Sequence, residues 1–97
     1  MTTAGLVVCA ISPHGTWCAF YQAANGALMV RHSRDGGATW DAPLQVQVDG
    51  ADASGVPLDA AYDARYNGLV LAYETTGGDR RVALSFDEGE TFSTILS

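Results

Sequence analysis

The chain of 97 residues has no lysine, and its five basic residues are all arginines, set against eleven aspartates and glutamates. The net charge of −6 opposes binding to nucleic-acid backbones and to anionic membrane surfaces, because both attract basic patches. Apolar runs long enough to cross a bilayer, which takes about 20 residues, are also absent. Residues 1–12 (MTTAGLVVCAIS) lack the basic start and the longer apolar stretch of a secretory signal, so we expect no signal peptide.

Helical periodicity is missing as well, because no window of about 15 residues places apolar side chains at helical spacing between capping signals. Short apolar segments bounded by Gly, Pro, Asn, Asp or Ser are instead typical of strands. The connections are too short for parallel crossovers, so we predict one small all-β, antiparallel domain or a piece of a larger one. The expected strands span residues 6–11, 16–21, 28–33, 43–48, 56–62, 68–74 and 80–86.

Several of these strands are apolar on both faces. Residues 6–11 (LVVCAI), 17–21 (WCAFY) and 69–73 (LVLAY) show no alternation of apolar and polar side chains. In an antiparallel sheet this pattern indicates that both faces are covered. A single small sheet cannot cover itself, so we expect further sheets stacked on either side of these strands.

An internal repeat relates the two halves of the chain. A shift of 52 residues places SRDGGATW, residues 33–40, over SFDEGETF, residues 85–92. The same shift brings Tyr21 onto Tyr73 and Val30 onto Val82. Both copies therefore have the order strand, strand, tight turn, strand, motif, strand. The second copy stops at residue 97, so we expect its last strand to be short.

The repeated pattern S-x-D-x-G-x-T-W/F suits a hairpin. Its aspartate can accept backbone N–H groups within the turn, and its glycine can adopt a positive φ. The threonine then begins the next strand, and the aromatic ring lies against the sheet edge. We therefore expect a structural role for the ten motif residues. They are Ser33, Asp35, Gly37, Thr39, Trp40, Ser85, Asp87, Gly89, Thr91 and Phe92.

Two copies of this motif, in phase with a four-strand repeat, resemble the Asp-box (BNR repeat) of sialidase-like β-propellers. The resemblance covers essentially the whole chain. It implies two four-stranded antiparallel propeller blades, at residues 1–50 and 51–97, with Asp-box hairpins at 33–40 and 85–92. In the family this box joins the third and fourth strands of a blade, away from the ligand-binding face, so it marks the fold and not catalysis.

Two blades do not close a ring, because four to eight blades surround the channel of a propeller. An isolated pair leaves an apolar sheet face uncovered at each end, as expected at an interface. We therefore expect other subunits to complete the ring. Six blades are usual in the family, so a homotrimer is favoured and a tetramer is next.

These features fit a non-enzymatic assembly and recognition module. We expect it in the cytoplasm or in a virion, for example as a tail or head accessory protein of a bacteriophage. Its partners are then further copies of the chain or other virion proteins, with no nucleic acid and no membrane among them.

A fragment of a sialidase-like glycoside hydrolase is one alternative. The family hydrolyses sialosides with three arginines that clamp the substrate carboxylate, a tyrosine nucleophile with a glutamate partner, and an acidic aspartate. No Arg-Ile-Pro stretch precedes residues 33–40, and the family's arginines come from several blades that this chain lacks. We therefore predict no catalytic residue.

A carbohydrate-binding lectin ring is the other alternative. The resemblance assigns the ligand face to residues 22–27, 49–55 and 74–79, where polar side chains beside an aromatic ring can hold a glycan. The candidate ligand residues are Asn25, Asp49, Asp52, Tyr73, Glu74, Asp79 and Arg80. Solvated turn residues are the competing interpretation. The acidic positions do not match a calcium loop, and we predict no metal and no cofactor.

The two cysteines, Cys9 and Cys18, lie on neighbouring strands. If residues 12–15 form a four-residue hairpin loop, the two cysteines stand opposite each other at a spacing that a disulfide can bridge. Without a signal peptide the reduced state is favoured, so we expect two buried thiols. No zinc-binding pattern is present, and His14 and His32 are interpreted as a turn residue and a packed strand residue.

Overall fold

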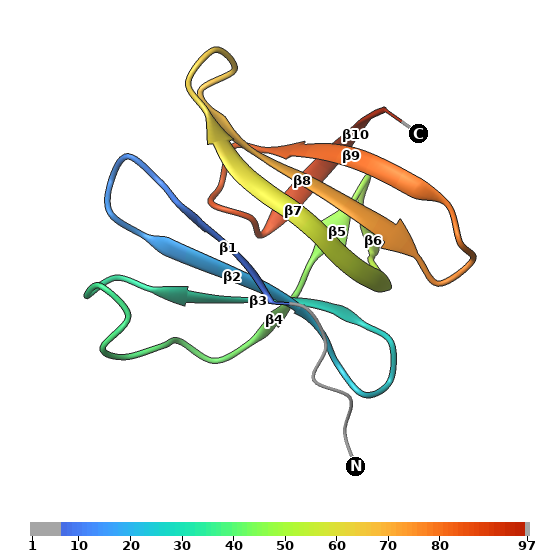
Figure 1. Cartoon of the computed structure of the whole chain (residues 1–97), viewed down its shortest axis with the longest axis horizontal. Helices are drawn as coiled ribbons and strands as arrows, with labels where there is room; N and C mark the ends of the chain where they lie inside the picture. The colour runs from blue at the N-terminus through green and yellow to red at the C-terminus, as the bar shows by residue number, and fades with distance from the viewer. Residues whose placement is uncertain (1–6, 97) are drawn as a thin grey trace.

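The computed structural model describes residues 7–96, which form ten strands in two sheets and no helix (Figure 1). The all-β class predicted from the sequence is confirmed. Residues 7–96 accordingly contain no helix of the length and apolarity needed to cross a membrane.

The first sheet is an antiparallel meander in chain order. Its strands are β1 (Val8–Ile11), β2 (Trp17–Gln22), β3 (Leu28–Ser33) and β4 (Leu44–Gln45). The second sheet has six strands in the order β6-β5-β10-β9-β8-β7. They are β5 (Gln47–Val48), β6 (Ala51–Asp52), β7 (Gly55–Asp63), β8 (Gly68–Thr75), β9 (Arg80–Ser85) and β10 (Thr91–Leu96).

Most predicted strands lie where the apolar segments indicated. The strands predicted at 16–21, 28–33, 56–62, 68–74 and 80–86 are present with their ends displaced by no more than about one residue. Of the segment 6–11, Leu6 lies outside the described residues and β1 begins at Val8. Turn residues at both ends of each apolar run account for this agreement.

The strand predicted at 43–48 is instead divided between the two sheets. Its first part, β4, pairs with β3, and its second part, β5, pairs with β10. Val46 is the crossing point: its side chain is fully buried, its N–H donates to the carbonyl of Leu28, and its carbonyl accepts from the N–H of Ala53. The chain therefore changes sheets at a buried valine that remains hydrogen-bonded on both sides.

The pairing of β5 with β10 is parallel, so the prediction of antiparallel pairing throughout is wrong at this edge. That prediction rested on the absence of a long single crossover between parallel neighbours. The connection from β5 to β10 instead runs through the four intervening strands of the same sheet. The second sheet is consequently a four-stranded meander, β7 to β10, extended by the β5–β6 hairpin.

The lengths of the fourth strands are also the reverse of the expectation. The strand expected to be short, at the end of the second copy, is β10 with six residues. Its counterpart in the first copy, β4, has two. The fourth strand of the first copy is short because the chain crosses to the second sheet after Gln45.

The repeat in the sequence is also a repeat in strand pairing. Tyr21 stands opposite Met29 between β2 and β3, and Tyr73 stands opposite Arg81 between β8 and β9, which is the same register after a shift of 52 residues. The turns correspond too, because Gly26 and Gly78 both have a φ near +90°. Each glycine donates its N–H to the carbonyl three residues earlier, which forms the same tight turn with a glycine bulge.

The core lies between the two sheets, where β1, β2 and β3 face β7, β8 and β10 (Figure 1). Phe20 of β2 and Phe92 of β10 meet edge to face, with ring centroids 5.9 Å apart. The side chains that fill this space are more than nine-tenths buried. They include Cys18, Phe20, Leu28, Val30, Val46, Leu69, Leu71, Tyr73, Ala83 and Phe92.

The expected opposition of Cys9 and Cys18 is wrong by one residue of register. Cys9 stands opposite Ala19, and Cys18 opposite Ala10. Gly15, with a φ of +86°, adds a bulge to the turn so that Ser12 bonds to Thr16, and the strands pair one residue later than a four-residue loop would give. The slip places the cysteines on opposite faces, with Cys18 buried and Cys9 exposed, so the expectation of two buried thiols fails for Cys9.

Candidate functional site

The two repeated motifs form the same hydrogen-bonded turn. In the first, Ser33 Oγ donates to Asp35 Oδ1 at 2.8 Å, and Asp35 accepts the N–H of Thr39 at 2.9 Å and its hydroxyl. In the second, Asp87 accepts the same three bonds, from Ser85 and from the N–H and hydroxyl of Thr91. The aspartates therefore act as turn acceptors, as the sequence predicted.

The glycines of the motifs adopt the positive φ that the pattern requires, with 92° at Gly37 and 90° at Gly89. The N–H of each glycine donates to the serine hydroxyl at the start of its motif at 2.9 Å. Only the second motif leads directly into a strand, since β10 begins at Thr91 whereas residues 39–43 are not in a strand.

These hydrogen bonds favour the ionised aspartates. The side-chain and backbone bonds from Thr39, followed by the bond from Ser33, lower the pKa of Asp35 to about 2. Burial raises the pKa of Asp87, but the bonds from Thr91 and Ser85 outweigh it, so the net pKa is also lowered. A carboxylate held in this state accepts hydrogen bonds and is unsuited to act as a general acid near neutral pH.

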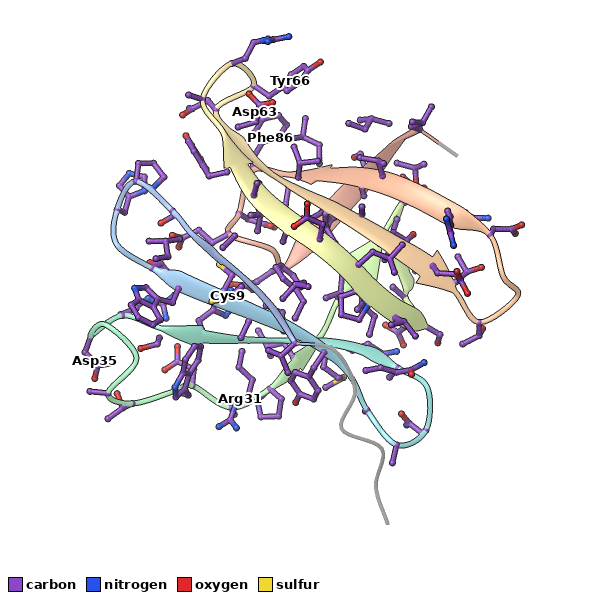
Figure 2. All side chains as sticks on the ribbon, viewed as in Figure 1. Cys9, Arg31, Asp35, Asp63, Tyr66 and Phe86 are labelled. Atoms are coloured by element: carbon purple, nitrogen blue, oxygen red, sulfur yellow. The ribbon has the colours of Figure 1, made fainter. Side chains whose placement is uncertain are left out.

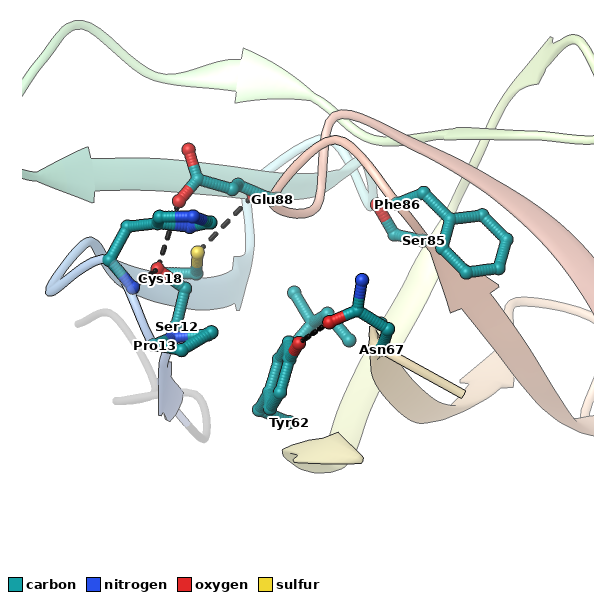
Figure 3. A pocket seen from close by; sticks show the side chains of 11 residues that line it. Ser12, Pro13, Cys18, Tyr62, Asn67, Ser85, Phe86 and Glu88 are labelled. Atoms are coloured by element: carbon teal, nitrogen blue, oxygen red, sulfur yellow. Dashed lines mark hydrogen bonds between the residues drawn. The ribbon is translucent and has the colours of Figure 1, made fainter. Parts of the chain in front are cut away.

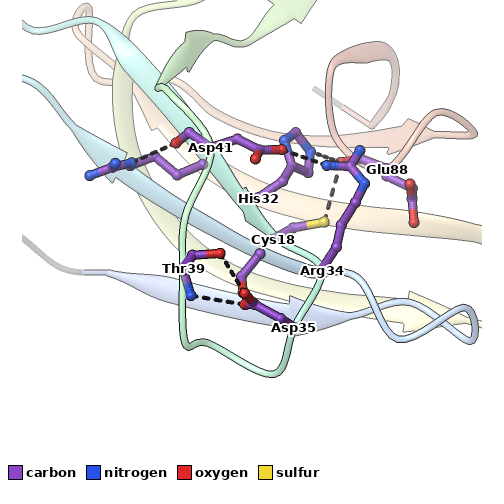
Figure 4. A network of polar contacts seen from close by, with 9 residues as sticks. Cys18, His32, Arg34, Asp35, Thr39, Asp41 and Glu88 are labelled. Carbon is purple, nitrogen blue, oxygen red and sulfur yellow. Dashed lines mark hydrogen bonds and ion pairs between the residues drawn. The ribbon is translucent and has the colours of Figure 1, made fainter.

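Glu88, inside the second motif, ties that motif to the first sheet (Figure 4). Its carbonyl accepts the thiol of Cys18 at 3.2 Å and the Nε2–H of His32 at 2.7 Å. Its carboxylate accepts the hydroxyl of Ser12 at 2.9 Å. The corresponding residue of the first motif is Gly36, which has no side chain and has open space around it.

A cavity of about 110 Å³ lies beside this contact, at the end of the molecule where the β1–β2 turn meets the β7–β8 hairpin (Figure 3). Tyr62 and Asn67 are hydrogen-bonded on one side of it, and Ser12 and Glu88 on the other. Burial, then the charge of Glu88, raises the pKa of the Cys18 thiol to about 12. The thiol is therefore protonated near neutral pH and is not an activated nucleophile.

The three loops predicted as a ligand face do meet, at the opposite end of the sheets. The N–H of Gly55 donates to the carbonyl of Gly26 at 2.9 Å, and Ala27 forms a bridge with Ser54. A side chain at Gly26 would touch Thr76, so the β2–β3 and β8–β9 turns are neighbours. The turns at residues 22–27 and 74–79 occupy equivalent positions in the two halves of the chain, and both lie at this end of the molecule beside residues 49–55.

Three of the seven candidate ligand residues line one hollow at this end, with a volume of about 320 Å³. These are Asp49, Asp52 and Tyr73, and Arg81 joins them. Tyr73 is only 2% exposed, so its ring forms the wall of the hollow and offers no open stacking surface. Hydrogen bonds from the side chain and the N–H of Thr94 lower the pKa of Asp49.

Arg81 was not among the sequence candidates, which named its neighbour Arg80. A signal was available, because alternation along β9 places residue 81 on the face of buried Ala83 and opposite Tyr73. Arg80 points to the other face, where it pairs with Glu74 at 3.3 Å and is largely exposed.

The remaining candidates lie outside the hollow. Asn25 caps its own turn by accepting the N–H of Ala27 at 3.1 Å. Asp79 lies 4.0 Å from Arg81 but is 73% exposed. Within the hollow, Asp52 also has a partner, because it accepts the side-chain amide of Gln47 across the β5–β6 hairpin. Most of these polar groups thus already have a partner in a turn or an ion pair.

The outward surfaces of the two sheets are apolar, and no other sheet formed by residues 7–96 lies against them. On the first sheet, the "Trp40 face" consists of Val7, Trp17, Ala19, Tyr21, Arg31 and Trp40. On the second, the "Ala72 face" consists of Val70, Ala72, Val82, Leu84 and Leu96. Most of these side chains are half-buried, and Val7 and Leu96 are each 65% exposed.

Among residues 7–96, no three His, Cys, Asp or Glu side chains gather in a way that would hold a metal ion. Comparisons of the chain with protein-family models, curated proteins and solved structures found no match.

Proposed function

We propose that the protein is a non-enzymatic assembly and recognition module. In this proposal its two sheets are Asp-box blades of a sialidase-like β-propeller, and other subunits complete the ring. One observation carries it: among residues 7–96, both outward sheet faces are apolar and uncovered, while the inward faces of the same strands form a buried core. Contiguous apolar surface of this kind is typical of interfaces.

Further copies of the chain are the favoured partners, and three copies would supply the six blades usual for the resembled family. A virion, such as a bacteriophage tail or head, is the setting that we propose, with other virion proteins as the alternative partners. A closed ring of identical chains buries two different faces of every subunit.

Three arginines that could clamp a substrate carboxylate already have partners, which supports a non-enzymatic role. The Nε–H of Arg31 donates to the carbonyl of Asp41 at 3.0 Å, and the carboxylate of Asp41 pairs with Arg34 at 2.5 Å (Figure 4). Arg80 pairs with Glu74 in the other sheet. These arginines thus do not converge on a single carboxylate-binding point.

Glycan binding at the hollow of Asp49, Asp52, Tyr73 and Arg81 is a second candidate function. The observation that favours it is the placement of two carboxylates and a guanidinium around one concave surface. Such groups can orient a sugar by hydrogen bonds. A glycan array tests it: binders should be lost in the variant Arg81→Ala but retained in Arg80→Ala, and an array without any binder would exclude it.

Native mass tests the assembly proposal. Light scattering after size exclusion, over a range of concentrations, should give a stable multiple of the chain mass of 10.2 kDa. A soluble monomer at every concentration would contradict assembly from identical chains. Turnover of a fluorogenic sialoside by the same sample would instead favour the hydrolase alternative.

A further inference from the structure

We propose that copies of this chain join head to tail, with the Trp40 face of one copy packed on the Ala72 face of the next. The inference rests on the proposed assembly function and specifies its partner and its contact. It follows from the way in which the two halves of one chain already pack together.

Inside the chain, the second sheet offers its inward face, with Leu69, Leu71, Ala83 and Phe92, to the first sheet. The first sheet receives it with Cys18, Phe20, Val30 and His32. The ring of Phe92 rests on Phe20, and the backbone of Gly89 lies against the same ring. This packing is therefore a contact between two unlike faces.

The repeat shows where the unlike faces recur on the outside. Shifted by 52 residues, Leu69, Leu71, Ala83 and Phe92 correspond to Trp17, Ala19, Arg31 and Trp40, which belong to the Trp40 face. Likewise Cys18, Phe20, Val30 and His32 correspond to Val70, Ala72, Val82 and Leu84, which belong to the Ala72 face. The strand registers agree under the same shift, so the positions in β2 and β3 are equivalent in space to those in β8 and β9. Trp40 lies outside a strand, but its ring meets that of Trp17 edge to face, on the outward side of the first sheet.

The sizes of the side chains at the central contact are complementary. The contact of Phe92 with Phe20 inside the chain corresponds to a contact of Trp40 with Ala72 between copies. In the contact between copies, a larger ring therefore meets a smaller side chain. A hollow of about 80 Å³ is present on the Ala72 face, lined by Asp59, Ala60, Ala61, Val70 and Ala72. Trp40 is half-buried, whereas its equivalent Phe92 is only 4% exposed. The docked Trp40 ring would cover this hollow as Phe92 covers Phe20.

The two faces differ in charge: the Trp40 face carries Arg31, and the outward side of the second sheet carries Asp59 and the ion pair of Arg80 with Glu74. Arg31 is the charged residue of the Trp40 face, and in Figure 2 its side chain points away from the second sheet. Asp59 lines the hollow beside Ala72 and is exposed. Pairing of two Trp40 faces would bring like charges together, so these charges disfavour the pairing of two identical faces.

A head-to-tail contact leaves one free Trp40 face and one free Ala72 face, at the two ends of any open assembly. Such a contact closes into a ring if the rotation between copies fits, and otherwise continues as a filament. The expected particle therefore has no free Trp40 face when closed.

Two complementary variants test the inference. Ala72→Arg blocks the Ala72 face and leaves the Trp40 face intact, and Trp40→Arg does the reverse, so that two blocked faces repel each other. Each variant alone should be monomeric, and an equimolar mixture should give one species of twice the monomer mass, because one intact pair of faces remains. The control Tyr66→Glu changes an aromatic residue that is 51% exposed and lies outside both faces, and it should assemble like the unmodified chain.

Contacts between identical faces give a different result. If two Trp40 faces paired, Ala72→Arg would keep the mass of the unmodified oligomer, and the mixture would form no mixed dimer. Either finding, with an oligomeric unmodified chain, overturns the head-to-tail inference and leaves the proposed assembly function standing. A monomeric unmodified chain overturns both.

A measurement without any substitution guards against misfolded variants. Cys9 pairs with Ala19 on the outward side of the first sheet and is exposed in the single chain (Figure 2). Its rate of reaction with a thiol reagent should fall at least severalfold as the protein concentration is raised through the assembly range. An unchanged rate in a sample that light scattering shows to be oligomeric would overturn the inference.

Discussion

The rings of Phe20 and Phe92 cross at 66°, with their centroids 5.9 Å apart, and this pair joins the first sheet to the second. Phe92 is the aromatic residue of the second motif, so a turn motif also supplies the central contact between the sheets. Gly89 permits the approach, because it brings backbone against the ring of Phe20 where a side chain would not fit.

Replacing Gly89 by alanine should destabilise the fold. The new Cβ would lie 2.8 Å from Cζ of Phe20, and the residue would keep a φ of +90° that alanine adopts poorly. Strain of this kind costs about 1–3 kcal/mol. Urea unfolding of Gly89→Ala should show a larger loss than Gly36→Ala, where φ is +74° but the space is open. Equal losses would mean that the Phe20 contact does not matter.

Stability should fall in acid because of the motif aspartates. The pKa of Asp35 is lowered from 3.8 to about 2, and that of Asp87 is lowered as well. A carboxyl with a lower pKa in the folded state contributes stability above the unfolded value, and this contribution is lost as the pH falls through the folded value. The urea midpoint should therefore decrease between about pH 4 and pH 2.

The variant Asp87→Asn provides the control for this acid effect. It should unfold more easily at pH 7, because the ionised acceptor of the Thr91 bonds is gone. It should also show a flatter dependence on pH between 4 and 2. A pH dependence as steep as that of the unmodified chain would show that other carboxyls cause the acid loss.

The two thiols should differ sharply in reactivity in the single chain. Cys9 is exposed, whereas Cys18 is buried and donates to the Glu88 carbonyl. A thiol reagent near neutral pH should label Cys9 first and reach Cys18 only when the protein opens. Because the pKa of Cys18 is raised from 9.0 to about 12, its contribution to stability is complete below pH 9 and should be lost as the pH rises toward 12. Equal labelling rates in native protein would contradict the assignment of opposite faces.

Removing the His32 donor should weaken the contact between the second motif and the first sheet. The variant His32→Leu carries the residue found at the equivalent position of the other half, Leu84, and leaves the Glu88 carbonyl with the weak Cys18 donor. An under-satisfied buried acceptor costs about 1–3 kcal/mol. Ser12→Ala removes only the partly exposed bond to the Glu88 side chain and should cost less. Chemical unfolding of the two variants measures the difference.

The strands and the motif turns could be predicted because local sequence determines them. Apolar runs between turn residues mark the strands, and the serine, aspartate and glycine of each motif supply the donors and acceptors of their own turn. The position of the repeat likewise follows from residue identities alone.

The predictions were wrong where a contact distant in sequence, or the backbone angle of a single residue, determines the strand pairing. Gly15 adds a bulge that moves Cys9 away from Cys18, and nothing in the loop length reveals it. The chain passes from the first sheet to the second at Val46, whose side chain is buried between the two sheets, and the local sequence does not reveal this burial site. The three loops named from the sequence do meet, but Arg81 and not Arg80 lines the hollow there, because strand alternation turns the two arginines to opposite faces of β9.

The parallel edge between β5 and β10 has a consequence for the order in which the protein can fold. The edge of β5 that faces β10 stays unpaired until residues 91–92 are available, although residues 47–48 leave the ribosome much earlier. Until then β5 is an open strand edge, available to other chains. Folding of this sheet is thus expected to finish late and to be slowed by the long loop that it closes, and a nascent chain lacking β10 should be prone to aggregate.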